Sequence, residues 1–368
     1  MSFALARHGY RAAGNTNPQL TITLGPTVSP SVVKMPFFDG VFAGTLLNDT
    51  LPNTLPHVVN STKQLIIPPT EDTPLHSKTY ADTATSRCQA TAMGWADYLN
   101  SKEICGVPTK PGKPIDPRVT YQAAEKNLDE CSWVLAQSQS ALQHKQKAQT
   151  EWSTLLQLLG FTQTSELLHQ AHISTDGKSR ALLFLELPQT TFDFATAVIM
   201  SFALPEATSA EILKHANWPK PKEKEDQKKW FDAAASLLGT IMSVWYPAGY
   251  VADTMSAPIA QFALDWFNNN GSKNNLLVAI SHEEPLNYFR AALGLGLFYY
   301  PQPTSCMLLV KENNILKVHI VKNKVDRKGT ISRKAEVESL PDVALETLQR
   351  LAAIEIQPLP DFVCRLTC

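Results

Sequence analysis

Apolar side chains recur every three or four residues along several stretches of the chain, which is the spacing of an amphipathic helix. Helices are therefore predicted over 87–100, 192–204, 230–245 and 251–267. A long helical region is expected to open at Asp116-Pro117, because proline fits the first turn of a helix. By the same reasoning another helix begins near Pro285, and a last one runs from Leu340 through Leu351.

Runs of leucine and β-branched residues predict strands between these helices. The expected strands are 179–187, 276–281, 305–311 and 315–322. Glu312-Asn313-Asn314 would join the last two as a hairpin. Because helices dominate the pattern, the predicted fold class is α+β, with a small and mostly antiparallel sheet.

The first eighty residues break this regular pattern. They are rich in threonine and proline, with short strands expected only at 20–24 and 63–67. We interpret residues 1–80 as a proline- and threonine-rich arm or irregular subdomain that docks on the rest. Residues 81–368 would form the main α+β unit, with two lobes divided near the proline- and glycine-rich loop at 106–116 as an alternative.

Composition narrows the classes of function. The 368 residues are 44% hydrophobic, enough for a substantial core, and the net charge of −1 gives no general attraction to nucleic acid. Two charge-free runs, 233–252 and 291–310, are long enough to span a bilayer. Polar residues interrupt the first run and Pro301-Gln302-Pro303 splits the second, so core helices are favoured and membrane association is disfavoured.

The six cysteines lack the two-residue gap of a zinc knuckle or redox motif and are too sparse for a disulfide framework. A reducing compartment is slightly favoured, and residues 1–10 show no apolar run typical of a signal peptide. No dinucleotide fingerprint or phosphate-binding loop is found, so no cofactor is predicted.

Cys88 is the residue that looks chemically poised. It would lie in the first turn of the helix predicted after Thr85 and Ser86, where unpaired N–H groups favour a thiolate, and Arg87 adds a positive charge. In this respect residues 85–99 resemble the nucleophile helix of papain-like and transglutaminase-like enzymes. The Gly-Ser that precedes the papain cysteine is missing, so no family is assigned.

A cysteine nucleophile needs a histidine base and a group that orients it. His172 is the first candidate, with Asp193 to orient it, and Cys88, His172 and Asp193 follow the chain order of a transglutaminase-like triad. His282, at the end of a predicted strand, and His319, inside another, remain alternatives. His282 is followed by two glutamates, but a metal site is disfavoured because no second histidine stands at helical spacing.

Three hypotheses follow from these observations. The first is a cysteine-dependent hydrolase or acyl or amide transferase that acts on a protein or peptide through Cys88. The second is an interaction or adaptor protein without chemistry, in which Cys88 is an inert buried thiol and residues 1–80 bind a protein or peptide partner. The third is a membrane-active helical protein that uses 233–267.

Overall fold

The computed structural model describes residues 1–11, 20–22, 31–33, 50–67, 75–81, 85–99, 139–158, 177–188, 191–201, 228–246, 249–269, 275–296, 299–325 and 331–354. The strands are β1 Ser2–Arg7, β2 Leu20–Ile22, β3 Ser31–Val33, β4 His76–Ala81, β5 Asn275–Ser281, β6 Cys306–Glu312, β7 Ile315–Val325, β8 Ile331–Ser339 and β9 Val343–Ala344. The helices are α1 Leu51–Ile66, α2 Ser86–Leu99, α4 Gln139–Leu158, α5 Gly177–Phe184, α6 Thr191–Ser201, α8 Lys228–Trp245, α9 Tyr250–Asn269, α10 Glu283–Ala292 and α11 Leu345–Ala352.

The main sheet has seven strands in the order β4-β5-β1-β6-β7-β8, with β9 also paired to β7. β4, β5 and β1 run parallel to one another, whereas β6, β7, β8 and β9 make antiparallel pairs. The α+β class and the dominance of helices are confirmed. The sheet itself is larger than predicted and mixed, because β1 and β4 add two parallel pairs to the predicted hairpin.

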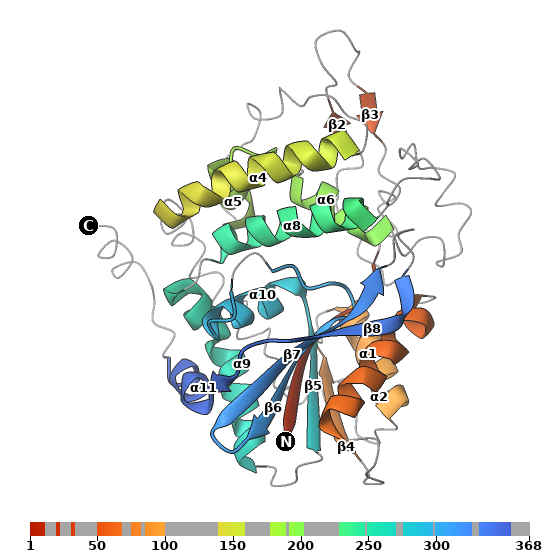
Figure 1. Ribbon diagram of the computed structural model, residues 1–368, viewed down its shortest axis with the longest axis vertical. Helices are drawn as coiled ribbons and strands as arrows, with labels where there is room; N and C mark the ends of the chain where they lie inside the picture. The colour runs from red at the N-terminus through yellow and green to blue at the C-terminus, as the bar shows by residue number, and fades with distance from the viewer. Residues whose placement is uncertain are drawn as a thin grey trace.

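The central strands β1 and β5 are buried on both faces, and the two-residue period of a strand decides which side chain goes to which face. On β1, Phe3 and Leu5 join a large core formed with helices α4 to α11, whereas Ala4 and Ala6 pack with α1 and α2. Figure 1 shows α1 and α2 beside one face of the sheet, α9 and α11 on the other side, and α4, α5, α6 and α8 beyond α10. Strands that are covered on both sides lose the alternation of polar and apolar residues by which an exposed strand is recognised.

The three parallel strands end at the same edge of the sheet, and each is followed by polar residues. β1 leads into Arg7-His8, β5 leads into His282-Glu283, and β4 precedes α2 with Arg87 in its first turn. In Figure 1 the N-terminus lies at the opposite end of β1 from α10. Carboxyl ends of parallel strands are where open sheets usually place their functional groups, so this edge is the first place to look for a site.

Several predicted elements are confirmed. The structure has helices at 86–99, 191–201, 228–245, 250–269 and 283–292, a strand at 275–281, and the hairpin of β6 and β7. Leu20–Ile22 is a strand, as expected within 20–24, and the last helix is α11. The helical region expected after Pro117 is described only over α4, since 101–138 lies outside the described residues.

Two predicted strands are wrong. Residues 179–187 contain most of α5, because a helix lets Ala181, Leu182 and Leu185 all reach the core, which a short apolar run does not reveal. Residues 63–67 cover the end of α1 and the residue after it. That helix tolerates Pro52 because proline in the first turn leaves no hydrogen bond unmade.

The division of the chain at residue 80 stays a prediction, but part of the first segment is not an arm. Ser2–Arg7 forms a fully buried strand between β5 and β6, and α1 covers one face of the sheet. The other residues of the predicted arm are described only in short pieces. Across the described residues, no helix has the length and apolar content needed to cross a bilayer.

Candidate active site

The loop after β1 holds Arg7 and His8 at the edge where the parallel strands end. Backbone bonds fix it from two sides: the His8 N–H donates to the Ser281 carbonyl at 3.0 Å, and the Thr304 N–H donates to the His8 carbonyl at 3.1 Å. The Gly9 N–H donates to Thr91 Oγ1 on α2 at 3.1 Å. The loop therefore has little freedom, and both side chains are fully buried.

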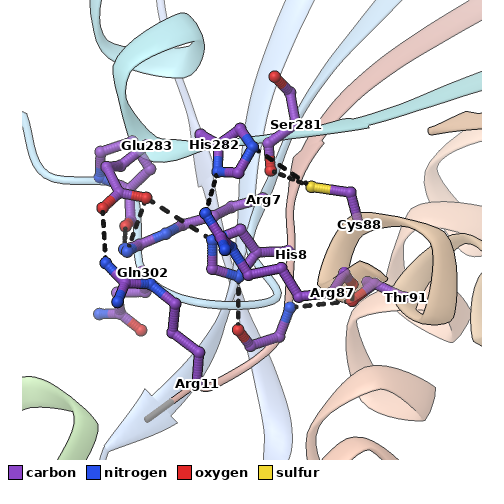
Figure 2. Close-up of polar contacts among 12 residues, drawn as sticks. Arg7, His8, Arg11, Arg87, Cys88, Thr91, Ser281, His282, Glu283 and Gln302 are labelled. Carbon is purple, nitrogen blue, oxygen red and sulfur yellow. Dashed lines mark hydrogen bonds and ion pairs between the residues drawn. The ribbon is translucent and has the colours of Figure 1, made fainter. Parts of the chain in front are cut away.

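Arg7 is held by an ion pair and a carbonyl. Its Nη2 lies 2.9 Å from Glu283 Oε2 (Figure 2). Its Nη1 donates to the Pro301 carbonyl at 2.5 Å, and its guanidinium lies over the Tyr300 ring. Burial alone lowers the pKa of Arg7, but the charge of Glu283 together with Tyr300 and Glu284 outweighs burial, and the net shift is upward. Arg7 is therefore a fixed positive charge inside the protein.

Glu283 is the carboxylate of the site. Burial raises its pKa, but Arg7 and Arg11 outweigh burial and hold the pKa at about 2. Arg11 Nη2 lies 3.9 Å from Oε1, and the side chain of Arg11 is 14% exposed. Glu283 is thus ionised at every ordinary pH, and Arg11 forms part of the outer edge of the site.

His8 presents one nitrogen to the site. Its Nδ1 lies 2.7 Å from the Gly9 carbonyl oxygen, which can only accept, so Nδ1 carries the proton and Nε2 keeps its lone pair. Among the described residues, no group hydrogen-bonds to Nε2, and Glu283 Oε2 lies 3.9 Å from it. Burial, followed by His282 and Arg7, lowers the pKa of His8 well below its usual value. The ring is therefore neutral, with an available nucleophilic nitrogen.

His282 differs from His8 because both of its ring nitrogens are engaged. Arg87 Nη2 lies 3.3 Å from Nδ1, and Cys88 Sγ lies 3.6 Å from Nε2 (Figure 2). The two imidazole rings meet edge to face, with centroids 5.1 Å apart. Of the two histidines, His8 is therefore the one whose nitrogen can attack a ligand.

Positive charge dominates the residues around His8. The guanidinium groups of Arg7 and Arg11 face the carboxylate of Glu283, and that of Arg87 contacts His282 Nδ1. Two helices, α2 and α10, also begin here, and their N-terminal N–H groups add partial positive charge. The arrangement suits an anion with several oxygens, and phosphate is the common one.

The ligand atoms of His8, His282 and Glu283 lie within 4.8 Å of one another, a spacing that a metal ion could bridge. The surrounding charges oppose that use. Glu283 is already paired with Arg7, and the nearby arginines repel a cation. An anion fits this set of residues better than a metal ion does.

The structure brings one of the three predicted catalytic residues to this site. Cys88 is fully buried, and its thiol lies 3.6 Å from the Ser281 carbonyl as well as from His282. Asp193 lies on α6 and pairs with Lys178 at 3.7 Å. His172 lies outside the described residues, so its role stays a prediction. Of the alternative bases, His282 is at the site, whereas His319 contacts Ser339 on the neighbouring strand.

The central residues were missed in the sequence. The pattern of residues 1–10 was interpreted only for the absence of a signal peptide, and neither Arg7 nor His8 was predicted to belong to a site. The signal was a histidine between Arg7 and Arg11, directly after the short apolar run of residues 3–6. A histidine with one arginine before it and another after it, at the end of a buried strand, indicates an anion site. The strand itself was not predicted, so this signal was not recognised.

No known protein family matches the chain, and no curated protein matches it significantly. Solved structures do share its fold. The phytase from Citrobacter braakii aligns with a TM-score of 0.54 and 14% identity, over 95% of this chain and 96% of that one. Hafnia alvei phytase in complex with tartrate gives a TM-score of 0.56 at 13% identity, over 97% and 96%. Klebsiella sp. ASR1 phytase gives 0.55 at 13% identity, over 95% and 94%.

The chain therefore has the phytase-like fold of the histidine acid phosphatases. This likeness overturns the cysteine-hydrolase hypothesis, since the solved structures that share the fold are phytases. The physical reason lies in the contacts of Cys88, because its sulfur is engaged by the Ser281 carbonyl oxygen and by His282 Nε2. The predicted protein or peptide partner stays a prediction.

Proposed function

We propose that the protein is a phosphate-monoester hydrolase with His8 as its nucleophile. The observation that carries the proposal is the neutral His8 ring, whose Nε2 faces Glu283 with arginines on both sides. The shared fold supports it, and the names of the similar proteins make phytate the first substrate to test.

In the first step the lone pair of His8 Nε2 forms a bond to phosphorus while the bond from phosphorus to the leaving oxygen breaks. Arg7, Arg11 and Arg87 hold the phosphoryl oxygens and stabilise the charge that spreads over them in the transition state. The Gly9 carbonyl keeps the proton on Nδ1 and stabilises the positive charge that the ring gains. The product of this step is a phosphohistidine.

The leaving oxygen needs a proton, and Glu283 is placed to transfer one. Its Oε2 lies 3.9 Å from His8 Nε2, within reach of a phosphoryl group attached there. Glu283 is ionised while Arg7 and Arg11 pair with it. A bound phosphate would share those two arginines, which raises the pKa of Glu283 and makes its protonation easier. The proton arrives with the substrate, since a phosphate monoester is a monoanion below about pH 6.

The second step returns the enzyme to its starting state. A water oxygen forms a bond to phosphorus, the bond from phosphorus to Nε2 breaks, and its electron pair goes back to His8. Glu283, deprotonated in the first step, accepts the proton that the water loses and passes it to the departing phosphate, so that Glu283 is ionised again. Inorganic phosphate leaves, and the overall change is one ester bond exchanged for one water.

The proposal is tested by loss of activity in H8A with p-nitrophenyl phosphate and phytate as substrates. His144, a buried histidine on α4, is the matched control, because H144A removes a buried imidazole away from the site. We expect H8A to lose all measurable activity and H144A to keep the wild-type rate per folded molecule. Equal activity of H8A and wild type would reject the function.

A further inference from the structure

We infer that Cys88 is a positioning residue: its thiol completes a hydrogen-bond chain from Arg87 through His282 to Ser281, which fixes the tautomer of His282 and the direction of Arg87. The chain joins the first turn of α2 to the end of β5, on two sides of the proposed anion site. The inference deepens the proposed function, and its kinetic part rests on it.

The direction of each hydrogen bond follows from what the groups can do. An arginine can only donate, so the contact of 3.3 Å from Arg87 Nη2 requires an unprotonated Nδ1 on His282. A neutral ring with a bare Nδ1 carries its proton on Nε2. That proton points to Cys88 Sγ, 3.6 Å away, so the sulfur is the acceptor.

The thiol also carries a proton of its own, which needs a hydrogen-bond acceptor. The Ser281 carbonyl oxygen lies 3.6 Å from Sγ and can only accept, so the Cys88 S–H donates to it. The sulfur thus accepts one bond and donates another, which requires the neutral thiol and not the thiolate. This use explains why a buried cysteine stands next to an arginine of the site without being its nucleophile.

The consequence for the site concerns Arg87. Its guanidinium is only partly exposed, and its contact with His282 Nδ1 holds it beside the His8 ring (Figure 2). Without the sulfur, the Nε2 proton of His282 loses its acceptor, and the ring is free to rotate or to move its proton to Nδ1. A proton on Nδ1 would face the Arg87 guanidinium, so Arg87 would turn away from the phosphoryl position.

The tautomer can be read directly from the ¹⁵N NMR signals of the His282 ring, assigned by comparison with H282Q, near neutral pH. In the wild type we expect Nε2 to be protonated and Nδ1 to be bare. C88A should give a mixture of tautomers, whereas C88S should keep the wild-type form because a hydroxyl also donates and accepts. A wild-type ring protonated on Nδ1, or a C88A spectrum unchanged from wild type, overturns the inference.

Kinetics with p-nitrophenyl phosphate supply the second readout. We expect C88A to lower kcat between about tenfold and a hundredfold with a smaller change in KM, as for other groups that position a catalytic side chain. C88S should recover most of the loss. The matched control is C306A, since Cys306 is also fully buried but bonds to Thr62, 3.4 Å away. C306A should keep the wild-type kcat, and an equal loss in C88A and C306A would contradict a positioning role.

Failure of the inference and failure of the proposed function give different results. If H8A remained active, the function would be wrong, but the spectrum of His282 would still decide whether Cys88 fixes the tautomer. If H8A were inactive and C88A had the wild-type kcat and spectrum, the positioning role of Cys88 would be rejected and the proposed function would be retained.

Discussion

Arg7 Nη2 lies 2.9 Å from Glu283 Oε2, and the two side chains are 0% and 4% exposed. A buried ion pair of this kind contributes little net stability, because removing both charges from water offsets their attraction. Its value here is placement: it keeps a positive charge and a carboxylate next to His8. Glu283 is also a negative charge that already pairs with Arg7 and Arg11, so a bound phosphate would have to share these two arginines with Glu283.

Replacing Glu283 tests this sharing. E283Q should lower the free energy of unfolding by about 3 kcal/mol, since it leaves Arg7 buried without a full counter-charge. Added inorganic phosphate should raise the melting temperature of E283Q more than that of the wild type, because the anion now meets unpaired arginines. Thermal unfolding with and without phosphate measures both effects.

Glu151 provides the control for that experiment. It pairs with Lys147 on α4 and accepts a hydrogen bond from Thr240 on α8 at 2.7 Å, away from His8. E151Q should show the same phosphate response as wild type, whatever its own stability. Equal phosphate responses in E283Q and E151Q would mean that Glu283 does not compete with phosphate for the arginines.

Proton transfer by Glu283 predicts a dependence on the leaving group. p-Nitrophenolate leaves without much help, whereas an alkoxide needs a proton. E283Q should therefore slow hydrolysis of an alkyl phosphate at least about a hundredfold more than hydrolysis of p-nitrophenyl phosphate. The ratio of the two rates is independent of the folded fraction, and an unchanged ratio would remove Glu283 from the proton-transfer role.

Stability should fall in acid through two groups. The pKa of Glu283 is lowered from 4.5 to about 2, so its contribution is complete above pH 4.5 and is lost as the pH falls toward 2. The pKa of His8 is lowered from 6.5, so below pH 6.5 the unfolded chain takes up a proton that the folded chain refuses. Both effects make the free energy of unfolding decrease as the pH decreases.

Chemical denaturation at a series of pH values separates the two groups. H8N should flatten the pH dependence just below 6.5, and E283Q should flatten it between 4.5 and 2. H319N is the control for H8N, because burial also lowers the pKa of His319 but its ring is only partly buried. A larger flattening in H319N than in H8N would show that His8 is not the buried neutral ring described here.

The arginines at the outer edge should matter for chemistry more than for folding. R11Q and R87Q should each lower kcat/KM by about a hundredfold, since each removes a donor to the phosphoryl oxygens. R290Q is the matched control: Arg290 is a partly buried arginine stacked on Tyr299 at the other end of α10. It should keep wild-type kcat/KM, and equal losses in all three variants would deny the edge arginines a special role.

Helix periodicity predicted most of this fold, and β5 was predicted as well, but the strand that positions Arg7 and His8 was missed. α8 and α9 are long and amphipathic or apolar enough to be recognised from spacing alone. β1 is short, buried on both faces and rich in alanine, so nothing in Ser2–Arg7 alternates. Because β1 was not predicted, the histidine that follows it had no expected neighbours.

Only some residues of the candidate site could be recognised in the sequence. Cys88 and His282 were both noticed, since one begins a predicted helix and the other ends a predicted strand, and the structure does bring them into contact. The sequence could not show that the cysteine is enclosed, nor that His8 lies against His282 across the sheet. Contacts between residues hundreds of positions apart depend on strand order, which local patterns do not encode.

The central claim is that His8 becomes phosphorylated, and it is tested most directly by trapping the intermediate. The wild-type protein is mixed with ³²P-labelled monoester, quenched in base, digested and mapped by mass spectrometry. The account predicts a base-stable, acid-labile phosphoryl group on Nε2 of His8, absent from H8A and present in H144A. A label on another residue, or turnover with no label on His8, would contradict it.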